Sequence, residues 1–160
     1  MRVHLERDAY INVMKERSMN GSRPLVSAGG IVYRIYNTKI QVVICCRKDP
    51  SSCNLPKGTP NSGETHEETA LREVREETGL EVRINEYIGN IEYEFPSSKG
   101  REMLHKSVFY YLMSPVGGDF TLHDTEFDTV GWVDEEKVFS TLTFSNEVEI
   151  VQKGLSLVKK

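Results

Sequence analysis

The sequence predicts an α/β protein of the mixed α+β type, in which a mixed β-sheet lies between helices. Short runs of alternating or β-branched residues, typical of strands, lie on both sides of an acidic segment with helical spacing. A second helical pattern closes the chain. The length of 160 residues favours one domain, and the content of 38% hydrophobic and 28% charged residues is that of an ordinary globular protein.

The predicted strands are bounded by turn signals. Residues 25–36 and 40–47 are separated by a short turn at 37–39, so we expect them to pair as a hairpin. Residues 48–52 are predicted to form a loop. The remaining strand patterns cover residues 80–84, 87–95, 106–113 and 130–133, with loops at 96–100 and 114–119.

Three segments outside the acidic one carry helical patterns. Residues 1–22 have apolar residues at helix-like spacing amid charges, which predicts an N-terminal helical extension ahead of a domain over 23–160. Residues 134–138 resemble the start of a helix. Apolar residues three and four apart predict a C-terminal helix over 145–157.

The acidic segment carries its own helix boundaries. Thr65 is suited to be the N-cap, with Glu68 reaching back to it as in a capping box. Gly79 is suited to end the helix in the left-handed conformation. Ala70 and Val74 belong to an apolar edge that lies beside the acidic edge of this helix, so one edge is expected to be buried and the other to face a cleft.

Three carboxylates converge on the acidic edge. Glu73, Glu76 and Glu77 are spaced i, i+3 and i+4, which places them on one helix face. Crowded carboxylates repel each other unless a cation neutralises them. Oxygen ligands without nearby cysteine or paired histidine favour Mg²⁺ or Mn²⁺, and Mg²⁺ often shares its protein sites with substrate phosphates. Arg72, one turn from Glu68 and Glu76, is expected to hold the acidic side chains in place.

The whole segment resembles the Nudix box. Gly58, then Glu64 after five residues, then residues 72–80 after seven more, fill every fixed position of that pattern. The resemblance covers about residues 25–155 and implies the Nudix fold, an α/β/α sandwich. It also implies Mg²⁺- or Mn²⁺-dependent hydrolysis of a nucleoside diphosphate linked to another group, with water attacking a phosphorus.

The resemblance assigns roles to the residues of the box. It implies that Glu73 and Glu77 ligate the metal directly, that the Gly58 carbonyl joins them, and that Glu76 is a ligand or the general base. Which glutamate takes the proton varies within the family, and Glu73 is the preferred candidate for the base here. Arg72 is expected to orient a carboxylate, and Glu64 to stabilise the loop before the helix.

Residues outside the box resemble one group within the family, the diadenosine tetraphosphate hydrolases. The stretch Leu55-Pro56-Lys57-Gly58 matches their entry to the box, and His105-Lys106 matches a later strand. By this resemblance Lys57 and Lys106 contact phosphates and Tyr93 stacks on a base. The group usually has an aromatic residue just before this entry, where this chain has Asn54.

Two further residues extend the predicted site. Glu126, just ahead of the strand at 130–133, resembles the late-loop glutamate that supplies an additional metal ligand or base in this family. Arg47, at the end of the second predicted strand, is a candidate phosphate contact. His66 has no partner at ligand spacing and is expected to lie on the surface of its helix.

Several functions are compatible with this pattern. The leading hypothesis is a pyrophosphohydrolase acting on a small nucleotide such as a dinucleoside polyphosphate. The alternatives within the family are a nucleoside triphosphate pyrophosphatase that removes oxidised nucleotides, an RNA 5′-pyrophosphohydrolase and an ADP-sugar hydrolase. A Nudix-fold binding or sensor module without turnover is a different class, although the presence of every box carboxylate argues against it.

The composition indicates the cellular location, the class of partner and the state of the cysteines. No run of about 18 apolar residues or signal-peptide core occurs, so we expect a cytoplasmic protein without a membrane span. The net charge of −4 argues against a broad nucleic-acid surface, although an RNA 5′ end stays open as a substrate. Cys45, Cys46 and Cys53 lack metal-ligand spacing and are expected to be reduced thiols. The pattern leaves open whether the chain is a monomer or a homodimer.

Overall fold

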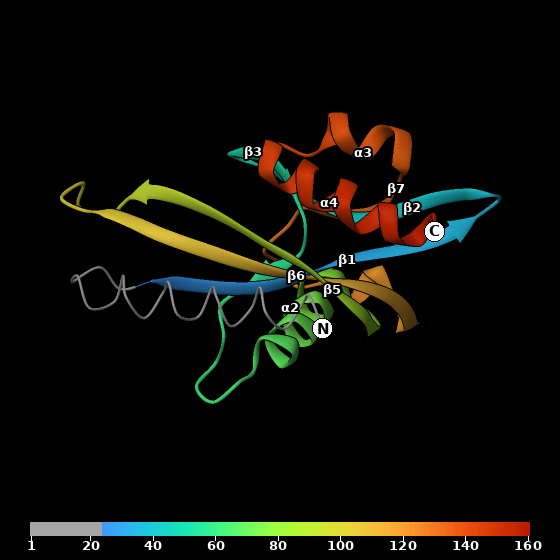
Figure 1. Ribbon diagram of the computed structural model, residues 1–160, viewed down its shortest axis with the longest axis horizontal. Helices are drawn as coiled ribbons and strands as arrows, with labels where there is room; N and C mark the ends of the chain where they lie inside the picture. Colours follow the sequence, from blue (N-terminus) through green and yellow to red (C-terminus); the bar gives the residue numbers. More distant parts are fainter. Residues whose placement is uncertain (1–23) are drawn as a thin grey trace.

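A mixed β-sheet separates two helical layers in the computed structural model, which describes residues 24–160 (Figure 1). Helix α2 (His66–Thr78) covers one face of the sheet, and helices α3 (Glu135–Thr141) and α4 (Ser145–Val158) cover the other. The predicted layer order is therefore confirmed. The helical extension predicted for residues 1–22 lies outside the described residues.

The sheet is built around two neighbouring strands that run parallel, β1 and β6. The order along the sheet is β3-β2-β1-β6-β5, with β4 pairing with β1 and β7 pairing with β2, and all these other pairings are antiparallel. The strands are β1 (Leu25–Tyr36), β2 (Lys39–Lys48), β3 (Ser51–Asn54), β4 (Lys57–Gly58), β5 (Leu80–Pro96), β6 (Met103–Gly118) and β7 (Thr129–Asp134).

The β1–β2 hairpin is confirmed, and its turn places Asn37 and Thr38 at positive φ. Other strand predictions needed correction. Residues 51–52, which were predicted to belong to a loop, are part of β3. The prediction missed this edge strand because its polar side chains give no strand pattern. Strand β5 continues through the predicted break at 85–86 by register shifts, and β6 extends to Gly118 through the loop predicted from residue 114.

Helix α2 begins and ends where the sequence indicates. The Thr65 side chain accepts a hydrogen bond from the Glu68 N–H at 3.1 Å, and the Thr65 hydroxyl donates to the Glu68 carboxylate at 3.1 Å. Gly79 ends the helix at φ 78°, where a side chain would be strained, and its N–H donates to the Arg75 carbonyl at 2.8 Å. These caps fix the start of the acidic edge relative to the loop before it.

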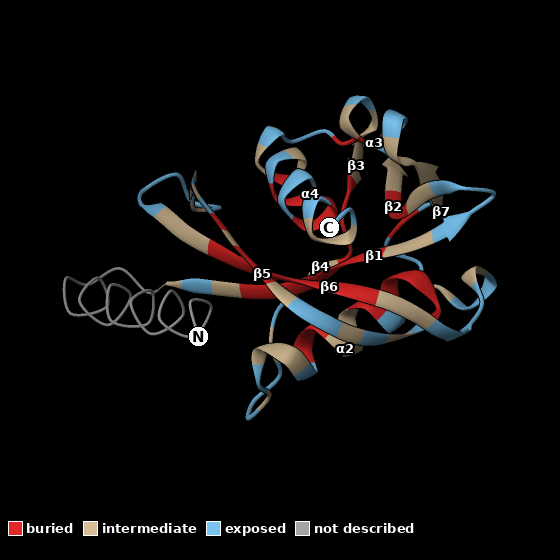
Figure 2. Ribbon diagram, turned by 45° about the vertical axis from the view of Figure 1, so that its right-hand side comes forward, coloured by how far each residue is buried: buried red, intermediate tan, exposed pale blue. Residues whose placement is uncertain are grey.

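The buried residues form two apolar clusters, and Figure 2 shows buried segments on the central strands and on helices α2 and α4. On the α2 side, Ala70 and Val74 pack with Phe109 of β6. On the α4 side, Ile31 and Tyr110 pack with Leu155. Burying a side chain of this size stabilises a fold by about 1.5–3 kcal/mol, so both helices are held firmly against the sheet.

Two expectations about single side chains are wrong. Cys46 and Cys53 form a disulfide, whereas Cys45 is a free, buried thiol; the strand register places the two bridged residues directly opposite each other. His66 does not lie on the open surface of α2, because its ring stacks on Phe109 with 4.3 Å between ring centroids. Among residues 24–160, no helix has the length and apolarity needed to span a membrane.

Candidate active site

Arg72 is the hub of the acidic edge of α2. Its guanidinium donates to Glu64 at 2.7 and 2.9 Å, to Glu73 at 2.9 Å and to Glu76 at 3.1 Å. It also donates to the Thr59 carbonyl at 2.9 Å. These contacts are those expected of a residue that orients carboxylates, which is the role predicted for Arg72. Its partner besides Glu73 and Glu76 is Glu64, however, and not Glu68.

Glu64 ties the loop before α2 to the helix. Its carboxylate accepts hydrogen bonds from the Asn61 N–H at 2.7 Å and from the Thr69 hydroxyl at 3.0 Å, in addition to Arg72. The hydrogen bond from Arg72, followed by that from the Asn61 backbone, lowers the pKa of Glu64 from 4.5 to about 2. This carboxylate is therefore committed to structure and stays ionised.

Glu73 packs directly on the backbone of Gly58. A Cβ atom at Gly58 would lie 2.0 Å from the Glu73 carboxyl carbon, so only glycine permits this approach. Glu77, 2% exposed, lies next to it and accepts a hydrogen bond from the Lys57 backbone N–H at 2.9 Å. Both carboxylates of α2 therefore contact strand β4, Glu73 at Gly58 and Glu77 at Lys57.

Glu77 is difficult to ionise without a cation, and the pKa of Glu73 is shifted in the same direction. Burial, followed by repulsion from Glu126, raises the pKa of Glu77 from 4.5 to about 9, and Glu73 adds to that repulsion. Burial also raises the pKa of Glu73, with Arg72 opposing the effect and Glu76 and Glu126 adding to it. The late-loop Glu126 therefore lies within electrostatic reach of both box carboxylates, as the sequence indicates.

Arg47 meets Glu126 rather than open solvent. The guanidinium lies 3.4 Å from the Glu126 carboxylate and stacks over the Phe127 ring at 4.8 Å from its centroid. This ion pair offsets part of the charge of the late-loop carboxylate. Arg47 is consequently near the acidic cluster, but its cationic group has a carboxylate partner.

A pocket of about 180 Å³ opens on the other side of β4. It contains Lys57 and Tyr93, two of the residues predicted to bind substrate. Phe144, 52% exposed at the start of α4, contributes a second aromatic side chain. The other lining residues are Asn54, which the sequence analysis singled out, and Ile91, Asn146 and Glu147, which it did not.

Lys106 lies beside this pocket. It is the direct cross-strand partner of Tyr93 in the β5–β6 ladder. Burial, followed by the charge of Lys57, lowers the pKa of Lys106, so the two ammonium groups are close enough to repel each other. Two cations that approach each other next to an acidic cluster are suited to a polyanion such as a phosphate chain.

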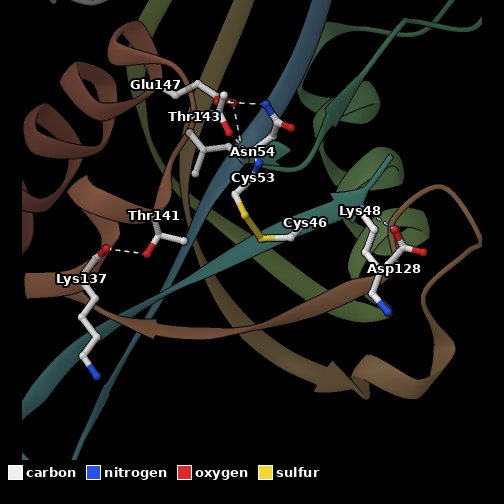
Figure 3. The surroundings of a disulfide bond; sticks show 10 residues. Cys46, Lys48, Cys53, Asn54, Asp128, Lys137, Thr141, Thr143 and Glu147 are labelled. Atoms are coloured by element: carbon white, nitrogen blue, oxygen red, sulfur yellow. Dashed lines mark hydrogen bonds between the residues drawn. A yellow bond between two sulfur atoms is a disulfide. The ribbon is translucent and has the colours of Figure 1, made fainter. Parts of the chain in front are cut away.

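Glu147 is a charged residue that lines the pocket, and Figure 3 shows its carboxylate beside Asn54. This carboxylate, 2% exposed, accepts hydrogen bonds from the Leu55 N–H at 3.0 Å, the Asn54 amide at 3.3 Å and the Tyr110 hydroxyl at 3.3 Å. Burial raises the pKa of Glu147, which these hydrogen bonds oppose. The network fixes Asn54 at the pocket wall.

Comparison with known proteins decides the family. The model of the NUDIX domain matches residues 26–153, which is most of the chain. The chain belongs to the NUDIX family. The acidic edge of α2 is thus its Nudix box, and strand β4 enters that box at Gly58.

Several proteins are similar to this NUDIX chain. MutT4 of Mycobacterium tuberculosis is 37% identical over 107 residues, which are 67% of this chain and 42% of that protein. An 8-oxo-(d)GTP phosphatase of Mycolicibacterium smegmatis is 24% identical over 152 residues, covering 89% of this chain and 45% of that protein. The chain therefore spans less than half the length of these two relatives.

A solved structure shares the fold. The binary complex of the C. elegans Ap4A hydrolase superposes with a TM-score of 0.70 at 22% identity, over 84% of this chain and 98% of that one. This likeness bears on the arrangement of the sheet and helices. It agrees with the α/β/α layers described above.

The Nudix box of this chain fits a hard divalent cation. Its donors are carboxylate and backbone oxygens, and their mutual repulsion is the kind that a cation relieves. Within residues 24–160, no three histidine, cysteine or acidic side chains are already gathered as a coordination shell. Mg²⁺ tolerates this, because it keeps several waters and is often held by one or two carboxylates plus substrate phosphates.

Proposed function

We propose that this protein hydrolyses a pyrophosphate linkage in a nucleoside diphosphate derivative with the help of Mg²⁺ or Mn²⁺. The observation that supports it is the position of strand β4 between two chemically different sites. Glu73 packs on Gly58, whereas the preceding residue, Lys57, contributes to the aromatic pocket. A substrate that lies along β4 would have its phosphates at the carboxylates and its base in the pocket.

The box carboxylates divide the chemical work. Glu73 and Glu77, with the Gly58 carbonyl, would hold the cation, and Glu126 would join them once Arg47 releases it. A bound divalent cation offsets phosphate charge and lowers the pKa of a bound water. Glu76 has a side chain that is 47% exposed and is held by Arg72, so it can accept a proton from the attacking water and pass it to solvent; Glu73 is the alternative base.

The pocket and the lysines bind the rest of the substrate. Lys57 and Lys106 would neutralise phosphates ahead of the scissile bond. Tyr93 and Phe144 offer ring faces on which a nucleobase can stack, a contact worth about 1–3 kcal/mol per base in nucleic-acid complexes. With Phe144 in the wall, the pocket has an aromatic residue despite Asn54 at the position usually aromatic in diadenosine tetraphosphate hydrolases.

The substrate within this class is best sought among dinucleoside polyphosphates and nucleoside triphosphates. The solved Ap4A hydrolase supports the first by its fold. The relative named 8-oxo-(d)GTP phosphatase supports the second, an oxidised-nucleotide pyrophosphatase. The two substrates differ in the group that leaves from the far side of the scissile bond.

A nucleotide panel tests the proposal. Dinucleoside polyphosphates, 8-oxo-dGTP and dGTP, ADP-ribose and 5′-triphosphorylated RNA are incubated with Mg²⁺, and the products are identified by mass. Release of a nucleoside phosphate that depends on Mg²⁺ and disappears in Glu77→Gln supports the proposal. Tight binding of nucleotides with no turnover of any panel member contradicts hydrolysis and identifies a sensor module.

A further inference from the structure

The disulfide lies next to Asn54, a residue of the candidate substrate pocket (Figure 3). Cys46 of β2 and Cys53 of β3 are direct partners in the antiparallel ladder. Strand β3 has four residues and forms the end of the sheet. Its last residue is Asn54, whose side chain lines the pocket. The bridge therefore fastens an edge strand one residue away from the pocket wall.

The same strand also holds a second part of the pocket wall. The Cys53 N–H donates to the Thr143 hydroxyl at 2.8 Å, and the Thr143 N–H donates to the Cys53 carbonyl at 3.0 Å. Phe144, the aromatic residue of that wall, follows Thr143 directly. Two pocket walls that come from distant parts of the chain are thus anchored on one cysteine.

We propose that Cys46 and Cys53 form a reversible dithiol–disulfide pair whose oxidation state sets the affinity of the pocket for nucleotide. The proposal rests on the proposed function for the identity of the ligand. It does not require that the ligand be hydrolysed, because the bridge acts on the walls of the pocket and not on the carboxylates of α2.

The chemistry is thiol–disulfide exchange with a low-molecular-weight disulfide such as oxidised glutathione. One cysteine thiolate attacks the small disulfide, which forms a mixed disulfide and releases one small thiol. The second cysteine thiolate then attacks the protein sulfur of that mixed disulfide and releases the other small thiol. The protein loses two electrons and two protons, and the small disulfide gains both pairs.

The expected effect follows from the weak hold on β3. Short edge strands open locally at low free energy. Opening of β3 would remove its ladder with β2 and the contacts of Cys53 with Thr143, so that Phe144 is loosened and Asn54 is held only by its hydrogen bond to Glu147. Ordering such side chains on binding lowers affinity, so reduction should raise the nucleotide Kd and KM by about three- to tenfold. The kcat value should change less, because Glu73 and Glu77 are carried by α2 on the other side of the sheet.

The test compares the full chain in both redox states. The protein is equilibrated with reduced or oxidised glutathione, its free thiols are counted by mass after alkylation, and the Kd of a non-hydrolysable nucleotide analogue is measured alongside KM and kcat. Cys46→Ser and Cys53→Ser remove the bridge. Cys45→Ala is the matched control, since it removes the neighbouring free thiol and leaves the pair intact. Circular dichroism of every variant checks the fold.

The inference predicts one free thiol after oxidation, three after reduction and a reversible shift in Kd. Both serine variants should bind like the reduced protein in either buffer, and Cys45→Ala should keep the shift. Three free thiols under oxidising conditions, or an equal Kd in both states, would overturn it. A shift in Kd without turnover of any nucleotide would uphold this inference and refute the proposed hydrolysis.

Discussion

The backbone N–H of Lys57 donates to the Glu77 carboxylate at 2.9 Å, while the rest of Lys57 belongs to the pocket wall. One residue therefore connects the acidic cluster to the candidate nucleotide pocket. The connection is rigid, because Glu77 is buried and strand β4 is paired with β1. Under the proposed function, a nucleotide in the pocket would be held at a fixed position relative to the carboxylates.

Glu77→Gln should abolish hydrolysis and leave the fold intact. Glutamine resembles the protonated carboxyl, the form that Glu77 has near neutral pH without metal because its pKa is about 9. Loss of a metal ligand removes several kcal/mol of transition-state stabilisation, so turnover should fall by about 10³-fold or more. Steady-state assays with Mg²⁺ measure this. Glu86→Gln, at an exposed position, is the control. Equal turnover in the two variants would show that Glu77 is not part of the active site.

Metal-free stability should fall as pH rises, in a manner that depends on Glu77. Its pKa is raised in the folded protein from 4.5 to about 9, so between these values the folded state binds more protons than the unfolded state. The wild type should therefore lose stability relative to Glu77→Gln from about pH 4.5 to about pH 9. Denaturant unfolding with EDTA measures the difference. A difference that is constant across this range would show that Glu77 is ionised without metal.

Arg72→Lys should impair the box through its carboxylates. Lysine keeps the charge but lacks the fork that reaches Glu64, Glu73 and Glu76 at once. Loss of such supporting contacts typically costs 10- to 100-fold, so we expect activity or Mg²⁺ affinity to drop by about that factor. Titration of activity with Mg²⁺ measures the change. The exposed Arg75→Lys is the matched control and should titrate like the wild type.

Tyr93→Ala should weaken substrate binding more than catalysis. The ring lines the pocket and is the cross-strand partner of Lys106. Loss of one stacking contact of about 1–3 kcal/mol corresponds to a rise of about 5- to 150-fold in KM. Tyr93→Phe keeps the ring and should retain a KM near that of the wild type. A drop in kcat at unchanged KM would show that the nucleobase of the substrate does not stack on Tyr93.

Glu147→Ala should destabilise the fold. It removes the acceptor of three buried donors, from Leu55, Asn54 and Tyr110. Leaving buried donors unsatisfied costs about 1–3 kcal/mol each, so with three donors a loss of about 3 kcal/mol or more in the free energy of unfolding is expected. Urea unfolding measures it. The exposed Glu149→Ala on the same helix should unfold like the wild type; an equally small effect at Glu147 would show that water replaces the carboxylate.

Local patterns in the sequence predicted the box and its helix well. These features depend only on residue spacing within one helix, which can be read from the sequence. They are the N-cap at Thr65, the end at Gly79 and the shared face of Glu73 and Glu77. The network around Arg72 was predicted only in part, because its partner Glu64 comes from the preceding loop. Contacts across the loop depend on its folded path.

Features that depend on tertiary register were missed. Cys46 and Cys53 face each other only because β3 pairs with β2 in one register, and a polar four-residue strand gives no pattern from which to infer it. Glu147 resembles a solvent-facing residue at the start of an amphipathic helix. It does lie four residues before Val151 and eight before Leu155, both buried, so its place on the buried stripe was the available signal.

The cation site is the centre of this account, and a crystal grown with Mn²⁺ and a non-hydrolysable nucleotide analogue tests it most directly. Anomalous scattering locates the metal without reference to activity. We predict Mn²⁺ in contact with carboxylate oxygens of Glu73 and Glu77 at about 2.1 Å, a distance typical of small octahedral cations, with the base between Tyr93 and Phe144. Mn²⁺ bound away from α2, or absent while the nucleotide is present, would contradict the account.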